Sequence, residues 1–242
     1  MKNFKTPFSL SLFLFLFLSS LAGNAGTITT VPNNSAPAIK KDVRFNAERL
    51  YDSLQLENYG LSKKAFQYAL KGYQKLLAKG RIENTDVITI CDFSLSSRQK
   101  RLFIIDLKNG ELLMNTYVAH GRKSGGEFAK SFSNKTNSHQ SSLGFYVTRN
   151  QYYGGNGHSL RLDGLEKGFN DKALRRNIVV HGSEYVGEDF LNSNNFLGRS
   201  YGCPAVPEGD IETVIDTIKE GSCFFIYYPA KKYLTSSKIL NG

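Results

Sequence analysis

The dipeptide Asn109-Gly110 constrains the fold more than any other short feature, because it stands between two apolar runs of strand length. These runs are Arg101 to Leu107 and Glu111 to Val118, and Asn-Gly between two strands is typical of a tight β-hairpin. Five more short runs rich in β-branched and aromatic residues predict further strands, at Asp86 to Phe93, Leu143 to Thr148, Ser159 to Leu162, Asn177 to Val180 and Ser222 to Tyr228. Residues 84–236 are therefore expected to form a mainly β domain.

Helical periodicity occurs on both sides of these strands. Residues 42–83 contain a weak helical pattern from Asn46 to Leu56, then a stronger one that Ser62 caps and Gly80 ends. The apolar face of the stronger helix comprises Phe66, Ala69, Leu70, Tyr73, Leu76 and Leu77, and we expect this helical pair to buttress the sheet. Ile211 to Ile218 predicts one more helix, and residues 237–242 are expected to be a frayed tail. The expected fold class is mainly β with flanking helices (α+β).

The N-terminal residues have the layout of a secretory signal peptide. Residues 1–25 combine two lysines, an apolar run from Leu12 to Leu18 that is too short to span a bilayer, and small residues at the end. An uncleaved anchor is the alternative. Residues 26–41, rich in Pro, Thr and Asn, are interpreted as a linker. We therefore expect an exported chain, in the periplasm or cell envelope, with no transmembrane segment after signal cleavage.

The net charge indicates which classes of molecule such a chain could bind. Cleavage after residue 25 would remove Lys2 and Lys5 and lower the net charge from +10 to +8. A basic exported protein could be attracted to anionic envelope polymers, although an excess of solvated surface lysines explains the charge equally well. No basic cluster is interleaved with aromatic residues, so no nucleic-acid site is predicted. The sequence leaves the oligomeric state open.

The candidate chemistry lies between residues 177 and 207, where a His-Gly pair is followed 22 residues after the histidine by a cysteine in Ser-Tyr-Gly-Cys. His181 would stand at the end of a buried strand, and Gly202 would let the backbone approach a substrate closely. N–H groups or a hydroxyl from Ser200, Gly202 and Cys203 could donate to a carbonyl oxygen under attack. The alternative is that Cys203 is a small buried hydrophobic residue and His181 a hydrogen-bonded one.

The pattern His-Gly, a loop and then Ser-x-Gly-Cys resembles the L,D-transpeptidase catalytic domain (YkuD-like), and GRSYGCPAVP most resembles its murein L,D-transpeptidase-like branch. The resemblance covers most of residues 42–233, including a loose match of Ser141 to Phe145 to the TPxG segment of the family. It implies Cys203 as nucleophile, His181 as base and Gly182 as the residue whose carbonyl orients the imidazole. It also implies a β-sandwich, a peptidoglycan stem peptide as substrate and no cofactor.

The sequence departs from the family pattern next to the cysteine. The commoner motif carries an arginine directly after the residue that follows the cysteine, whereas this chain has Pro204-Ala205. Arg199 is the nearest arginine and could substitute for it in binding a substrate carboxylate, with a surface salt bridge as the alternative role. The predicted oxyanion and substrate group therefore comprises Arg199, Ser200, Tyr201 and Gly202.

Two loops and the remaining histidines leave alternatives open. The long polar segment 122–142 is expected to be functional or disordered, and Tyr152 to His158 could wall a cleft or form a plain turn. His120, His139 and His158 have no short metal-binding spacing, so no metal site is predicted, and His120 or His158 is favoured as a cleft residue. No G-x-S-x-G motif exists to support serine catalysis.

Cysteine pairing and the reaction itself also remain open at this stage. Cys91 and Cys223 both lie in strand-like runs and could form a disulfide that leaves Cys203 free. Three other functions compete with transpeptidation, namely an L,D-carboxypeptidase, an amidase, and a peptidoglycan-binding protein without turnover.

Overall fold

The structure is a computed structural model that describes residues 47–242, so the predicted signal peptide, the linker and the first five residues of the helical segment 42–83 lie outside the described residues. The strands are β1 Val87–Asp92, β2 Leu102–Asp106, β3 Glu111–Thr116, β4 Gly144–Gly154, β5 Gly157–Gly164, β6 Val179–Ser183, β7 Ala205–Pro207 and β8 Cys223–Tyr227. The helices are α1 Ala47–Ser53, α2 Lys63–Ala78, α3 Glu188–Ser193, α4 Ile211–Ile218, α5 Lys231–Ser236 and α6 Lys238–Asn241, with 3₁₀ turns at Leu174–Arg176 and Glu208–Asp210.

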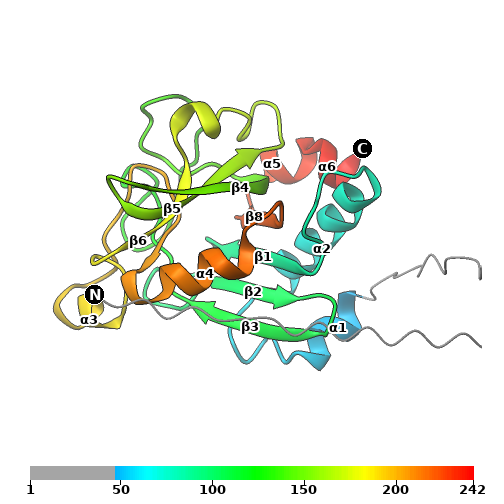
Figure 1. Ribbon diagram of the computed structural model, residues 1–242, viewed down its shortest axis with the longest axis horizontal. Coiled ribbons are helices and arrows are strands. Elements are labelled where there is room, and N and C mark those ends of the chain that lie inside the picture. Colours follow the sequence, from blue (N-terminus) through cyan, green and yellow to red (C-terminus); the bar gives the residue numbers. More distant parts are fainter. Residues whose placement is uncertain (1–46) are drawn as a thin grey trace, which may run out of the picture. The chain divides into compact units, whose positions relative to one another are not determined.

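All eight strands belong to one hydrogen-bonded sheet with the order β3-β2-β1-β8-β4-β5-β6-β7 (Figure 1). The predicted hairpin is confirmed, because β2 and β3 are antiparallel and Gly110 has a φ of 70° in the turn between them. The β1–β8 and β6–β7 pairs are parallel, and the other pairs are antiparallel. The mainly β fold class with flanking helices is therefore confirmed.

The two ends of this sheet meet. The segment that follows β3 forms an antiparallel bridge between Ala119 and Ala205 of β7, in which the Ala119 N–H donates to the Ala205 carbonyl at 2.8 Å. A second bridge joins Gly121 to Ser200. Both edges of the sheet thus contribute to the region that contains residues 199–205.

Helix α2 covers one face of the sheet. Ser62 caps it as predicted, since the Ser62 hydroxyl accepts from the Ala65 N–H at 3.3 Å. Gly72 lies against the ring of Phe145 in β4, where an added Cβ would stand 1.9 Å from a ring carbon, so only glycine permits this approach. The Phe145 ring stacks in turn on Phe225 of β8, with centroids 4.1 Å apart. Leu77, expected on the packed face, is instead 41% exposed.

Helix α4 covers the opposite face. Its apolar positions Ile211, Val214, Ile215 and Ile218 are buried as predicted. Thr148 of β4 donates its hydroxyl to the Ile218 carbonyl at 2.7 Å, and Thr148 is three residues from Phe145, so the two side chains point to opposite faces of the strand. Buried residues of α2, α4 and the sheet form one hydrophobic cluster. The helical segment that was predicted to end at residue 83 therefore shares its core with the strands that follow.

The predicted frayed tail at residues 237–242 is wrong. Residues Lys238–Asn241 form α6, in which Ile239 and Leu240 are buried, and the Lys75 ammonium of α2 donates to the Lys238 carbonyl at 3.0 Å. The carboxylate of Glu166 fastens this end of the chain, since it accepts from the hydroxyls of Tyr233 and Ser237 and from the Phe145 N–H. Burial raises the pKa of Glu166 above its ordinary value.

The Glu166→Ala variant should be less stable by about 2–4 kcal/mol, because it leaves the Tyr233 hydroxyl and the Phe145 N–H buried without an acceptor. Urea denaturation measures the free energy of unfolding. The matched control is Lys167→Ala at the exposed neighbouring residue, which should change it by less than about 0.5 kcal/mol. Equal stability of the two variants would show that the carboxylate does not hold the C-terminal helices.

A buried arginine determines the protonation state of His120, which lies at the end of the segment that follows β3. Arg101 is fully buried and donates to the carbonyls of Leu95 and Val118 and, at 2.9 Å, to Nδ1 of His120. An arginine is always a donor, so Nδ1 carries no proton. Burial, and then the Arg101 charge, lower the pKa of His120 to about 3.

This depressed pKa predicts a specific acid sensitivity. Between pH 6.5 and pH 3 the unfolded chain protonates His120 and the folded chain does not, so the stability from neutral His120 is lost as the pH falls. Relative to His120→Asn, the wild type should lose up to about 1.4 kcal/mol per pH unit in this window. Denaturant unfolding of both proteins at pH 7 and pH 4.5 measures the difference, and parallel losses would contradict the assignment.

Candidate active site

His181 lies within strand β6 and not at its end as predicted, because the strand continues to Ser183. It is hydrogen-bonded on both sides, opposite Ser159 of β5 and Ala205 of β7. The Nδ1 atom is 2.8 Å from the Gly182 carbonyl, which can only accept, so Nδ1 carries the proton and Nε2 is left with a lone pair. Burial lowers the pKa of His181, which favours the neutral imidazole that can act as a base.

Cys203 precedes β7 by two residues and is held beside the histidine strand by the parallel pairing of β6 with β7. The His181 N–H points to the Pro204 carbonyl at 3.4 Å, directly after the cysteine. The Sγ atom is 3.6 Å from the carbonyl of Asn177, two residues before β6, and Cys203 is 9% exposed. Burial raises the pKa of the Cys203 thiol, while the charge of Arg176 opposes that rise.

Within residues 47–242 the Cys203 thiol is hydrogen-bonded to the Asn177 carbonyl and to the Val179 backbone, and the His181 ring is hydrogen-bonded to the Gly182 carbonyl. The fold therefore brings thiol and imidazole to adjacent strands as neutral groups.

Ser200 and Gly202 have different contacts from those expected. The Ser200 hydroxyl donates to the Cys203 carbonyl at 2.6 Å and accepts from the Gly202 N–H at 3.0 Å, so both groups are used inside the loop. Gly202 has a φ of 125°, and a Cβ there would stand 2.7 Å from the Gln140 carbonyl oxygen. Within residues 47–242 the N–H groups of Tyr201 and Cys203 have no acceptor, which makes them the available donors.

Residues 122–142, named here the covering loop, pack on the cysteine motif. The Arg122 N–H donates to the Ser200 carbonyl at 2.7 Å, and the Ser141 hydroxyl donates to the Gly202 carbonyl at 3.3 Å. The rings of His139 and Tyr201 lie 4.6 Å apart. The covering loop thus packs against Ser200, Tyr201 and Gly202.

Arg176 is a site residue that the sequence analysis missed. Its guanidinium donates to the carbonyls of Ser133 at 2.7 Å and Gln140 at 2.5 Å and to the hydroxyls of Ser138 and Ser142. It therefore fastens the covering loop, and its charge favours the Cys203 thiolate. The only available signal was Arg175-Arg176 immediately before the buried strand, and nothing local distinguishes the second arginine from the first.

Arg199 and Tyr201 lie on the outside of the motif. The Arg199 guanidinium donates to the Gly125 carbonyl at 3.0 Å and lies 5.4 Å from the centroid of the Phe196 ring. Tyr201 is 63% exposed, and the Arg122 guanidinium lies 5.5 Å from its ring centroid.

The remaining histidines do not gather around the thiol. His158 of β5 is 2.7 Å from the Glu212 carboxylate and 3.1 Å from Gln151, in a region where β4 and β5 extend into a hairpin. The cysteine motif is contacted by the ring of His139, which lies against Tyr201, and by the backbone carbonyl of His120, which accepts from the Ser200 N–H. Across residues 47–242, no three His, Cys, Asp or Glu side chains are grouped to hold a metal ion.

The other two cysteines are free and fully buried. Cys91 lies opposite Ile226, and Cys223 lies opposite Ile88, so their strands are adjacent but the two residues are three positions out of register. This offset places them too far apart for the disulfide considered from the sequence.

No helix in the described part of the chain has the length and apolar character needed to cross a bilayer.

Comparison with solved structures finds L,D-transpeptidases. The chain is similar to the L,D-transpeptidase from Mycobacterium smegmatis with 12% identity and a TM-score of 0.37, covering 59% of each chain. It is similar to the L,D-transpeptidase from Xylanimonas cellulosilytica with 14% identity and a TM-score of 0.35, covering 74% of this chain and 93% of that one. It is also similar to the helical cell shape determining protein Pgp2 from Campylobacter jejuni, with 12% identity and a TM-score of 0.40. That match covers 66% of this chain and 57% of Pgp2. The chain thus spans well under two thirds of the mycobacterial protein.

These structural similarities are too distant to carry an argument on function, and no curated protein was found to match the sequence. The family assignment rests on the sequence itself. Residues 57–227, well over half of the chain, match the YkuD_2 family, described as the L,D-transpeptidase catalytic domain. The protein therefore belongs to the family of L,D-transpeptidase catalytic domains.

Proposed function

We propose that this protein is an exported cell-wall enzyme, a cysteine-dependent L,D-transpeptidase that acts on peptidoglycan stem peptides through a thioacyl-enzyme intermediate. The single observation that carries the proposal is the β6–β7 pair, which holds His181, with Nδ1 on the Gly182 carbonyl, beside the cysteine motif. Family membership supports the reaction class. The signal-like residues 1–25 and the basic net charge support export and attraction to anionic envelope polymers.

In the proposed first half-reaction, Nε2 of His181 takes the thiol proton of Cys203 as sulfur attacks the carbonyl of the third, diamino-acid residue of a tetrapeptide stem. The carbonyl becomes an oxyanion, which the free N–H groups of Cys203 and Tyr201 stabilise. The carbon–nitrogen bond then breaks, and the imidazolium gives its proton to the departing D-alanine amine. The stem is left as a thioester on Cys203.

In the second half-reaction, an acceptor amine attacks the thioester and transfers a proton to His181. Sulfur leaves as a thiolate, which the imidazolium protonates, so the resting enzyme is regenerated. If water takes the place of the amine, the same site acts as an L,D-carboxypeptidase, and attack on another envelope bond makes it an amidase.

The resting charges of the pair fit proton transfer during attack. Burial raises the pKa of Cys203 and lowers that of His181, so both groups are neutral before the substrate binds. We assign Arg176 to the support of the thiolate as it forms, since its charge opposes the rise of the thiol pKa. We assign Ser200 and Gly202 to the shape of the loop, because their polar groups bond within it.

Iodoacetamide should modify Cys203 faster than it modifies Cys91 or Cys223 in the native protein. Cys91 and Cys223 are fully buried, and burial raises their pKa values far above the ordinary value. Peptide mapping of the adducts after a short incubation checks the prediction. Labelling of Cys91 or Cys223 at the rate of Cys203 would contradict it, and labelling in urea should modify all three.

Product analysis tests the proposed function. Muropeptide mass spectrometry should show new cross-links with the wild type and none with Cys203→Ala, while His181→Ala should slow acylation about 10²–10⁴-fold with the fold intact. Intact-mass analysis with imipenem, whose strained β-lactam carbonyl replaces the stem carbonyl, should give one adduct on the wild type and none on Cys203→Ala.

Other products identify the competing functions. Shortened stems without cross-links identify a carboxypeptidase, and unchanged muropeptides with retained binding identify a non-catalytic binder. An imipenem adduct on Cys203→Ala would exclude Cys203 as the nucleophile.

A further inference from the structure

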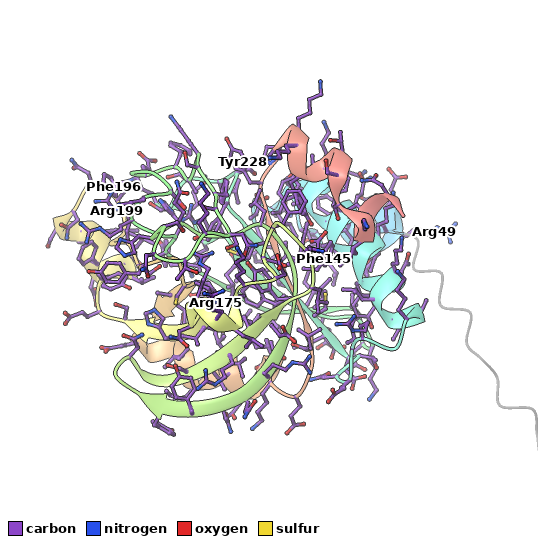
Figure 2. All side chains as sticks on the ribbon, turned by 90° about the horizontal axis from the view of Figure 1, so that it is seen from above. Arg49, Phe145, Arg175, Phe196, Arg199 and Tyr228 are labelled. Carbon is purple, nitrogen blue, oxygen red and sulfur yellow. The ribbon has the colours of Figure 1, made fainter. Side chains whose placement is uncertain are left out.

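An open cavity of about 480 Å³ adjoins the outer side of the cysteine motif. Arg122, Phe196, Arg199 and Tyr201 line it, and we name it the arginine pocket. Figure 2 shows Phe196 and Arg199 next to each other at one end of the molecule, beside helix α3. The pocket lies outside the Cys203–His181 pair, and it contains Arg199 and Tyr201, which the sequence analysis placed in the substrate group, together with Arg122, which it did not.

The two guanidiniums in the pocket are held against aromatic rings. Arg122 lies over Tyr201, and Arg199 lies over Phe196, with distances from the guanidinium carbon to the ring centroid of 5.5 Å and 5.4 Å. A guanidinium stacked on a ring keeps the N–H donors of its plane directed sideways. Arg199 uses one donor on the Gly125 carbonyl, and Arg122 has one long contact of 3.4 Å with the Tyr201 hydroxyl, so most of their donors are free for a ligand.

The charge of the arginine pocket is not balanced by the protein. No aspartate or glutamate lines the pocket, and within residues 47–242 neither arginine takes part in an ion pair. Two adjacent guanidiniums with free planar donors fit a carboxylate, which can accept two bonds from one fork. A neutral amide offers one acceptor and no charge, and a cation would be repelled.

We propose that the arginine pocket binds the terminal carboxylate of the substrate, on the leaving side of the bond that is cleaved. The identity of this ligand rests on the proposed function. Tyr201 lines the pocket two residues before Cys203, and two residues span at most ~7 Å, so the pocket begins close to the nucleophile. The terminal carboxylate of a tetrapeptide is one residue beyond the carbonyl under attack, which matches this reach.

This placement makes the pocket a determinant of specificity. A stem that ends one residue after the scissile bond can present its carboxylate to Arg122 and Arg199. A longer stem places a neutral peptide bond at the same point, so it loses the charge interaction. Its additional residue must also fit between the rings of Phe196 and Tyr201, which line the pocket. The arginine pocket would thus select the length of the donor peptide.

Calorimetric titration of the full chain carrying Cys203→Ala tests the proposal without turnover. The titrants are a tetrapeptide stem with a free terminal carboxylate and the same peptide with a terminal carboxamide. The free acid should bind about tenfold more tightly, as expected for an open but bidentate arginine–carboxylate contact, and the ratio should shrink as salt is raised. Arg122→Gln and Arg199→Gln should each reduce the ratio of the affinity for the acid to the affinity for the amide. The double variant should bring this ratio to about one.

Two further variants sharpen the test. Arg199→Lys keeps the charge but loses the planar fork, so it should lose part of the preference for the acid. Arg81→Gln, at an exposed arginine after α2 that does not line the pocket, makes the same charge change and should leave the ratio as in the parent.

Three results would overturn the proposal: equal binding of the acid and the amide, an affinity ratio that is unchanged in the double arginine variant, or no binding of either peptide. Because the titration uses Cys203→Ala, absence of turnover in the wild type would refute the proposed function and leave this measurement intact.

Discussion

The hydrogen bond between Ala119 and Ala205 is the contact on which the arrangement of the site depends. Strand β7 is only three residues long and has β6 as its one partner in the sheet. The bridge gives it a second neighbour from the opposite edge, at 2.8 Å, two residues from Cys203. It also brings His120 to Ser200, whose N–H donates to the His120 carbonyl at 3.1 Å. The position of the cysteine therefore depends on contacts from both edges of the sheet, β6 on one side and the segment after β3 on the other.

Local signals in the sequence were sufficient for the central hairpin and for the cap of α2, but not for the short elements β7, α3, α5 and α6. The hairpin at Asn109-Gly110 and the Ser62 cap of α2 depend on residues within four positions of each other, so each could be predicted from a short window. The tail at residues 237–242 was misjudged because α6 is only four residues long and is stabilised by packing of Ile239 and Leu240, not by helix propensity.

The composition of the site was less predictable than its central pair. Cys203 and His181 stand in a recognisable motif, and the parallel register of β6 and β7 places their strands together. Arg176 could not be found in this way, because its bonds go to Ser133, Ser138, Gln140 and Ser142, more than thirty residues away in sequence. The bond from the Ser200 hydroxyl to the Cys203 carbonyl could not be predicted for a different reason, since a sequence does not show which way a loop hydroxyl turns.

The burial of Cys203 has a consequence for the durability of the protein. Peroxides oxidise the thiolate, not the thiol, and carry an accessible thiolate through sulfenic acid to irreversible products. The raised pKa of Cys203 keeps the thiolate fraction small, and only 9% of the residue is exposed. The proposed nucleophile is thus held mostly as the less reactive thiol, so the same burial that slows its activation would also slow its oxidation.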